Sequence, residues 1–235
     1  MRILYIITGL RHGGAEKLLY LTCKYLGRMP EILIDVIYFD PYAPMLPLFT
    51  QLGIKPNLIK HNIMLIPRLM QSIHKGKYTI IHTHLIHADI EGRLAAFLAS
   101  SPKQTAIFTT AHGTEWFRWR PDLYCKTVRL VDRWLSRPRR SHVIAISQSV
   151  RQVLIKNQRI SQDKIHLLYN AIELLAPALV QKKNLNNSIL RLLFVGRLSA
   201  EKNIPCLLRA LYLVRDLPIS LTVVGEGKMK NVIKI

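Results

Sequence analysis

Short apolar segments alternate with segments of helical periodicity along most of this chain. Residues 3–8 form a continuous apolar run, which is typical of a parallel strand buried on both faces. Helical spacing follows from residue 15, where Leu18, Leu19 and Leu26 fall on one side. The order strand, helix, strand favours an α/β fold built on a parallel sheet. The same alternation predicts further strands at 32–39, 55–59, 78–84, 105–111, 142–146 and 165–169, and helices at 44–52, 63–74 and 88–99.

The alternation stops once and then resumes. Residues 174–188 include Pro177 and an asparagine-rich patch, and their irregularity indicates an interdomain linker. After it, we expect a strand at 190–195, a helix at 204–215 and a strand at 220–224. The pattern therefore predicts a complete Rossmann-like N-terminal domain at 1–173, a linker at 174–188 and an incomplete Rossmann-like C-terminal domain at 189–235.

The chain is strongly basic, with 34 Lys and Arg against 14 Asp and Glu, a net charge of +20 and a pI near 10.2. Such an excess points to a polyanionic partner or surface. No zinc-finger spacing, basic zipper or RNP-type aromatic signature accompanies the charge, so we do not expect nucleic acid as the partner. An anionic membrane surface is the favoured alternative.

Cysteine usage and the N-terminal residues bear on the compartment. Cys23, Cys125 and Cys206 are far apart and show no CxxC spacing, so neither a disulfide framework nor a zinc site is indicated. The N-terminal apolar run has no signal-peptide cleavage site, and no uncharged run of about 18 residues suggests a membrane span. We expect a cytoplasmic protein that can lie on the inner face of the membrane.

Residues 115–140 combine cationic and aromatic side chains. Eight basic residues stand against three acidic ones, a local net charge of +5, and five aromatic residues are interleaved. Trp116, Arg118, Trp119 and Arg120 are the residues that we expect at an anionic bilayer or an acceptor. A solvated helix with its aromatic rings turned into the core explains the composition equally well. Single-stranded nucleic acid would favour the same mixture.

Glycines and histidines follow several of the predicted strands. Gly13 and Gly14 precede a helix, so the backbone there can approach a ligand, although tight turns use glycine too. Their spacing is not GxGxxG, which counts against a nicotinamide dehydrogenase. His112 follows a strand, where open α/β sheets bind ligands, and a capping or core histidine is the alternative. His82 and His84 also end a strand, but no third ligand follows at metal-binding spacing, so no metal is expected.

Arg197 and Lys202 lie in a short loop between an expected strand and an expected helix. The N-terminus of that helix adds unpaired N–H groups and the positive end of the helix dipole. Because Arg can bind two phosphate oxygens and Lys acts as a compact charge, the pair suits a diphosphate. A solvated basic turn is the alternative.

Seven of these segments, in this order, resemble motifs of the group 1 (family 4) retaining glycosyltransferases, which have the GT-B fold. One departs from the family pattern, because Ala171 stands where the family usually has glycine. The segments are Gly13-Gly14-Ala15-Glu16, His82-Thr83-His84, Thr110-Ala111-His112-Gly113, Ser147-Gln148-Ser149-Val150, Asn170-Ala171-Ile172-Glu173, the run 194–203, and Gly225-Glu226-Gly227.

The resemblance implies transfer of a sugar from a nucleotide-sugar donor to a lipid-linked or saccharide acceptor, with retention of configuration and without a bound metal. In that reaction His112 would contact the transferred sugar or orient the acceptor hydroxyl. The segment from Trp116 to Trp134 would hold a membrane-surface acceptor. The residues assigned to the donor site by resemblance are Gly13, Gly14, Arg197, Lys202 and Glu226.

One family motif is missing from the sequence. The family has a Glu-x7-Glu pattern that meets the donor sugar and ribose, and no glutamate here has another eight positions on. Residues 189–235 number 47, whereas a whole domain takes about 100–200. The resemblance therefore implies a truncated chain with weak or absent transfer activity. A non-catalytic basic module that binds anionic membrane or nucleic acid is the alternative function.

Overall fold

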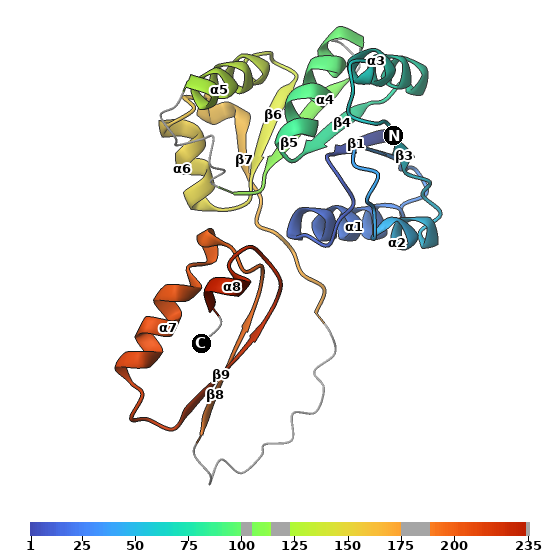
Figure 1. The fold of residues 1–235 in the computed structure, drawn as a ribbon. Coiled ribbons are helices and arrows are strands. Elements are labelled where there is room, and N and C mark those ends of the chain that lie inside the picture. Colours follow the sequence, from blue (N-terminus) through green and yellow to red (C-terminus); the bar gives the residue numbers. More distant parts are fainter. Residues whose placement is uncertain (100–104, 114–122, 175–188, 234–235) are drawn as a thin grey trace. The chain divides into compact units, whose positions relative to one another are not determined.

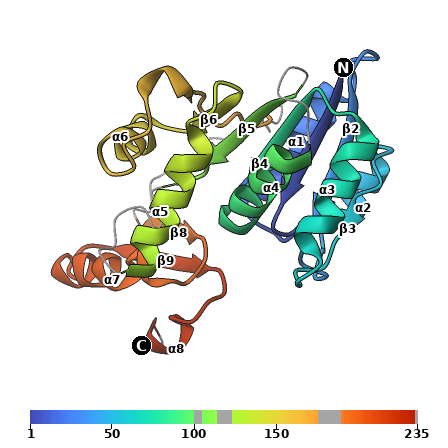
Figure 2. The ribbon, with the colours of Figure 1, turned by 90° about the horizontal axis from the view of Figure 1, so that it is seen from above.

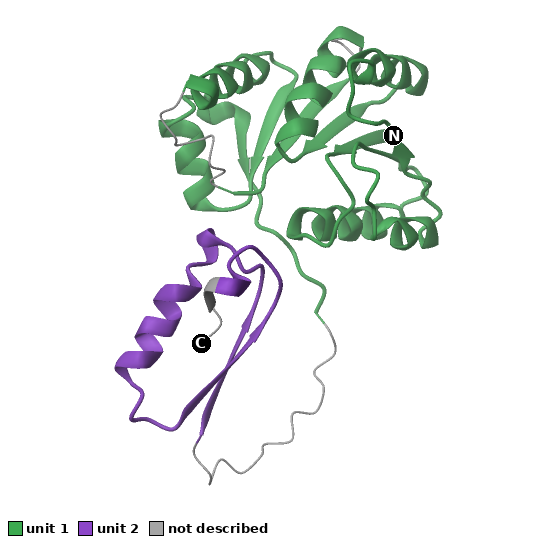
Figure 3. Cartoon of the chain, in the orientation of Figure 1, with its two compact units in different colours: residues 1–174 green, residues 175–235 purple. Residues whose placement is uncertain are grey.

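The computed structural model of the chain describes residues 1–99, 105–113, 123–174 and 189–233. The chain divides into two compact units, residues 1–174 and 175–235, shown in green and purple in Figure 3. Each unit has its own parallel sheet.

Unit 1 contains a seven-stranded sheet in which every neighbouring pair of strands is parallel. The strand order is β3-β2-β1-β4-β5-β6-β7, so the first strand of the sequence lies inside the sheet (Figure 1). This arrangement confirms the predicted α/β fold. The strands are β1 (Arg2–Ile7), β2 (Leu33–Tyr38), β3 (Asn57–Leu58), β4 (Ile80–His84), β5 (Ala106–Ala111), β6 (Ser141–Ala145) and β7 (Ile165–Leu167).

Helices cover both faces of this sheet, because alternate residues of each strand point to opposite sides. Leu4 and Ile6 of β1 pack in one apolar cluster with α3 and α4, whereas Tyr5 and Ile7 pack in another with α1 and α2. Figures 1 and 2 show the two pairs of helices on opposite sides of β1. The helices are α1 (Gly14–Leu26), α2 (Leu46–Gln51), α3 (Leu65–Gly76), α4 (Ile86–Ala99), α5 (Leu123–Ser136) and α6 (Gln148–Lys156).

Local contacts fix where three of the helices begin. Ser147 caps α6, because its Oγ accepts a hydrogen bond from the backbone N of Val150 at 3.2 Å. The start of α3 is displaced from residue 63, since the Asn62 side chain accepts from the Met64 N–H at 3.0 Å and forms a turn there. Leu85 adopts φ +68° directly after β4, so α4 begins at residue 86 rather than 88.

A fully buried arginine joins α4 to α5. The Arg93 guanidinium contacts the carboxylates of Asp89 and Asp132, with 2.7 Å between Arg93 Nε and Asp89 Oδ1. It also donates to Ser136 Oγ at 3.0 Å. Gln158 donates to the second oxygen of Asp132 at 2.6 Å. These contacts satisfy charges that would otherwise be costly in the protein interior.

Unit 2 has two parallel strands and a connecting helix. The side chains of Leu192 and Phe194 are half-buried, whereas Leu193 and Val195, on the other face of the strand, are 67% and 69% exposed. The elements are β8 (Leu190–Val195), the 3-10 turn η3 (Ala200–Lys202), α7 (Ile204–Leu213), β9 (Ile219–Val224) and α8 (Lys230–Ile233).

Candidate active site

The carboxyl ends of β1, β2, β4 and β5 meet at one edge of the unit 1 sheet, because all its strands are parallel. The loop after β1 is tied to the end of β2 there. The backbone N of Asp40 donates to Thr8 O at 2.9 Å, and Arg11 Nε donates to Asp40 Oδ2 at 2.7 Å. These bonds hold the glycine-rich turn at the strand ends.

The glycine turn accommodates a buried carboxylate. Glu16 lies in the first turn of α1 and is 8% exposed. A Cβ on Gly13 would lie 2.2 Å from Glu16 Oε2, whereas a Cβ on Gly14 would meet nothing within 4 Å. A negative charge near a helix N-terminus is favourable, so Gly13 makes room for a carboxylate that stabilises α1. The sequence motif contained Glu16, but nothing in it indicated this contact.

The two glycines should therefore respond differently to alanine. We expect Gly13→Ala to lower the free energy of unfolding by about 1 kcal/mol, because the added methyl group forces the end of the buried Glu16 side chain to shift. Gly14→Ala should leave stability unchanged or raise it by up to about 1 kcal/mol, since alanine is the better helix former. Urea denaturation followed by circular dichroism measures both, and equal values for the two variants would contradict the assigned role of Gly13.

Histidines line the sheet face that carries α1. Tyr5, His82 and Phe108 are aligned across β1, β4 and β5, so their side chains share this face. The ring centroids of His82 and His84 are 4.3 Å apart. His84 Nδ1 lies 2.9 Å from His112 Nε2, just beyond the end of β5. His84 and His112 were predicted at the ends of two separate strands. The structure brings them into contact.

Burial keeps these imidazoles uncharged at neutral pH. Desolvation, with a smaller effect from His112, lowers the pKa of His82 to about 3. Desolvation also lowers the pKa of His112 to about 4. The pKa of His84 lies well below its ordinary value, first because of burial and then because of His82 and His112. The three side chains can donate and accept hydrogen bonds but carry no positive charge at pH 7.

The contact between His84 and His112 indicates where their protons lie. His84 Nε2 is buried and has no hydrogen-bond partner among the described residues. A buried N–H without an acceptor is costly, so we infer that His84 carries its proton on Nδ1 and donates it to His112 Nε2. A neutral His112 that accepts at Nε2 then has its own proton on Nδ1. His112 is thereby prepared to donate one hydrogen bond from that atom.

In unit 2, the loop after β8 exposes the two predicted cations. Leu198 is 4% exposed and anchors the loop, whereas the Arg197 and Lys202 side chains are exposed. Contact with the Ser199 hydroxyl lowers the pKa of the Glu201 carboxyl, and Arg197 and Lys202 lower it further. The positive charges of Arg197 and Lys202 therefore both reach the Glu201 carboxylate. Their role in donor binding stays a prediction.

The glycine turn after β9 packs directly on this loop. Gly225 has φ +155°, and a Cβ there would lie 1.9 Å from Gly196 O, so no other residue fits without displacing backbone. The backbone O of Glu226 accepts from Leu198 N at 2.9 Å. The Glu226 side chain is largely exposed and pairs with Lys230 at 2.8 Å. Donor binding by Glu226 also stays a prediction.

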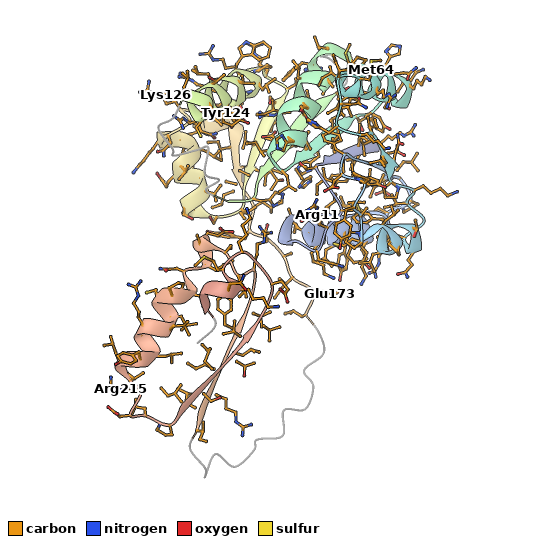
Figure 4. All side chains as sticks on the ribbon, in the orientation of Figure 1. Arg11, Met64, Tyr124, Lys126, Glu173 and Arg215 are labelled. Carbon is orange, nitrogen blue, oxygen red and sulfur yellow. The ribbon has the colours of Figure 1, made fainter. Side chains whose placement is uncertain are left out.

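The predicted membrane residues Trp116, Arg118, Trp119 and Arg120 lie outside the described residues. The helix that follows them, α5, is described. Its Tyr124 and Trp134 side chains are 59% and 57% exposed, so the alternative that places the aromatic rings in the core is wrong for these two. Figure 4 labels Tyr124 and Lys126, which both project from α5. None of the helices in the described part of the chain has the length and apolar character needed to cross a bilayer.

Comparisons with known proteins identify the family. The sequence model of Glycosyltransferase Family 4 matches residues 12–174. The UDP-Gal:alpha-D-GlcNAc-diphosphoundecaprenol alpha-1,3-galactosyltransferase of Escherichia coli is 30% identical in an alignment of 232 residues that covers 91% of this chain and 55% of that enzyme. The chain thus spans about half the length of this curated relative.

Solved structures show the same fold. The crystal structure of Anabaena HepE in complex with UDP-glucose matches with a TM-score of 0.72 and 22% identity, over 96% of this chain and 61% of that one. The apo form of the lipopolysaccharide outer core galactosyltransferase WaaB matches with a TM-score of 0.67 and 16% identity, over 99% of this chain and 63% of that one. These similarities confirm the predicted GT-B-like class. Since the family match covers more than half of the residues, the chain belongs to glycosyltransferase family 4.

Proposed function

We propose that this chain supplies the acceptor-side unit and part of the donor-side unit of a retaining glycosyltransferase. The proposed reaction transfers a sugar from a nucleotide-sugar donor to a lipid-linked or saccharide acceptor. The observation that carries the proposal is the family match over residues 12–174, which contain the strand-end site with His112. Two similar proteins support it, since one is a galactosyltransferase that uses UDP-Gal and a diphosphoundecaprenol-linked sugar and the other binds UDP-glucose.

Arg197 and Lys202 would bind the donor diphosphate. When the bond to the sugar breaks, negative charge grows on the leaving diphosphate, and preorganised cations stabilise it. The exposed guanidinium and ammonium groups in the loop before α7 have the chemistry for this task. In unit 1, the Gly13-Gly14 turn would let the backbone approach a nucleotide-sugar. Charge stabilisation by these groups would proceed without a bound metal.

His112 would position a hydroxyl group of the donor sugar or the acceptor. Its pKa of about 4 keeps it neutral, so it would act as a hydrogen-bond donor and not as a positively charged acid. His84 would hold the ring in the required tautomer through the 2.9 Å contact. Because the contact fixes both the orientation and the proton of His112, His84 would be a positioning residue.

The α5 helix would place the acceptor side on an anionic membrane at the inner face. Leu130 and Trp134 are exposed on this helix beside exposed cations such as Lys126. Apolar side chains can enter the interface while basic residues meet anionic headgroups. The same surface is the observation that favours the second candidate function, a non-catalytic basic module on a membrane.

Donor binding can be measured on the 235-residue chain without requiring turnover. Titration with UDP-galactose in a calorimeter should show binding that Arg197→Ala weakens by about 10- to 100-fold, as expected for one lost charged hydrogen-bonding group. Arg209→Ala, an exposed arginine on α7, is the matched control and should bind as the wild type does. Unchanged affinity in Arg197→Ala would remove the loop from the donor site.

Transfer itself needs a separate assay. With radiolabelled UDP-galactose and a lipid-linked saccharide acceptor, we expect this chain to show weak or no transfer, because the Glu-x7-Glu carboxylates are absent from it. Sedimentation with anionic liposomes tests the second candidate function. Binding to vesicles without any nucleotide-sugar binding would favour the non-catalytic module on a membrane. A salt-sensitive shift with nucleic acid alone would favour a nucleic-acid-binding module and contradict the transferase.

A further inference from the structure

Three metal-ligating side chains lie together at the carboxyl edge of the unit 1 sheet, apart from the histidines that surround His112. His61 comes from the loop between β3 and α3, and His87 and Glu91 lie one turn apart on α4. One ligand atom from each of the three lies within 4.8 Å of the other two. His61 Nε2 is 2.7 Å from Glu91 Oε1, and the ring centroids of His61 and His87 are 5.8 Å apart.

One carboxylate oxygen of Glu91 is left without a hydrogen bond in the part of the chain that the structure describes. Glu91 Oε2 is buried, and it has no hydrogen-bond partner among the described residues. A buried carboxylate oxygen without a hydrogen bond destabilises the fold. The 2.7 Å contact with His61 involves Oε1 and does not satisfy Oε2. A cation bound beside the carboxylate would compensate for that cost.

We propose that His61, His87 and Glu91 bind a divalent cation of the zinc class. Two imidazole nitrogens and one carboxylate oxygen suit zinc, whereas magnesium and calcium prefer oxygen ligands. Tetrahedral zinc with bonds of about 2.0–2.2 Å holds its ligand atoms about 3.4 Å apart. In the cluster, His61 Nε2 and Glu91 Oε1 are 2.7 Å apart and no pair of ligand atoms is more than 4.8 Å apart, so small side-chain movements would reach that value. His61 and His87 are exposed, so their rings can rotate to close the site.

The cation would lie at the wall of a cavity. His61 and His87 also line a cavity of about 630 Å³ that Thr8, Asp40 and Lys60 border. Three protein ligands leave the fourth tetrahedral position for water or for a group in this cavity. Lys60 adds a positive charge nearby, so an anionic group such as a phosphate would complete the coordination. The ion would also fix the loop before α3 to α4.

Cobalt provides a direct test on the full chain without a histidine tag. We expect Co²⁺ to bind one site and give the visible d–d bands of a four-coordinate complex, and excess Zn²⁺ to remove them. His87→Ala and Glu91→Gln should each weaken Zn²⁺ binding by at least about 10-fold in calorimetry. Glu91→Gln is the sharper variant, because the amide keeps the size of the side chain and its hydrogen bond to His61.

His166→Ala is the matched control. His166 forms another close imidazole pair, with His142 Nδ1 3.1 Å from its Nε2, and it should bind Zn²⁺ as the wild type does. Unchanged affinity in Glu91→Gln, missing d–d bands, or loss of the site in His166→Ala would each overturn the proposal. Circular dichroism of the metal-free variants confirms that they are folded, and His61→Ala replaces any variant that is not. No nucleotide sugar is present, so these outcomes are independent of the proposed transfer function.

Discussion

Acidification from pH 7 to pH 5 is expected to lower the free energy of unfolding by about 2 kcal/mol for each of His82 and His112. Their folded-state pKa values are about 3 and about 4, whereas an unfolded histidine titrates near pH 6.5. Between these values the unfolded state binds more protons than the folded state. The stabilisation is therefore present above about pH 6.5 and is lost as the pH falls. His84 acts in the same direction.

Urea denaturation at pH 7, 6 and 5 measures this dependence. His82→Phe should reduce the change between pH 7 and pH 5 by about 2 kcal/mol, because phenylalanine does not titrate. Nuclear magnetic resonance gives an independent check, since the ring resonances of His82 and His112 should keep their neutral positions at pH 5, with free imidazole as the reference. An equal free energy of unfolding at pH 7 and pH 5 would contradict the low folded-state pKa values of these histidines.

Replacing Arg93 with alanine should destabilise unit 1 by about 3–5 kcal/mol. The substitution leaves the carboxylates of Asp89 and Asp132, which are 5% and 2% exposed, without the guanidinium between them. Removing one partner of a buried ion pair is more costly than removing both, because the remaining charge cannot be hydrated. A loss of this size is a large part of the 5–15 kcal/mol typical of a whole domain.

A mutant cycle separates this charge effect from lost packing. Asp132→Asn in the Arg93→Ala background should restore part of the stability, with a coupling of about 0.5–3 kcal/mol. Arg68→Ala, at an exposed position of α3, is the matched control and should change stability by less than about 0.5 kcal/mol. Urea denaturation of the wild type, Arg93→Ala, Asp132→Asn and the double variant gives the four free energies of the cycle. A loss under 1 kcal/mol in Arg93→Ala would contradict the role assigned to the buried pair.

Local patterns predicted the elements of this fold better than they predicted its contacts. The apolar run at 3–8 and the Ser147 cap depend on neighbours in the sequence, so both could be recognised there. The Arg93 to Asp132 contact joins two helices and spans 39 residues. Nothing near Arg93 in the sequence indicates that contact. The buried role of Arg93 therefore could not be predicted from the sequence.

The candidate site shows the same division. His112 was predicted because a histidine after a buried strand is a local signal. Its contact with His84 depends on the register of β4 against β5, which pairs His84 with Thr110. The sequence did not specify that register. Likewise, His61 and Glu91 are 30 residues apart and meet only because β3 ends and α4 begins at one edge of the sheet.

The central position of β1 sets the order in which unit 1 can assemble during synthesis. Tyr5 pairs with His82 across the middle of the sheet, so the β1 edge that β4 will occupy stays open until residue 84 leaves the ribosome. At about 5–20 residues per second this interval lasts roughly 4–15 s. The nascent chain therefore exposes the edge of an apolar strand for seconds. A chaperone that covered this edge would prevent it from pairing with another chain.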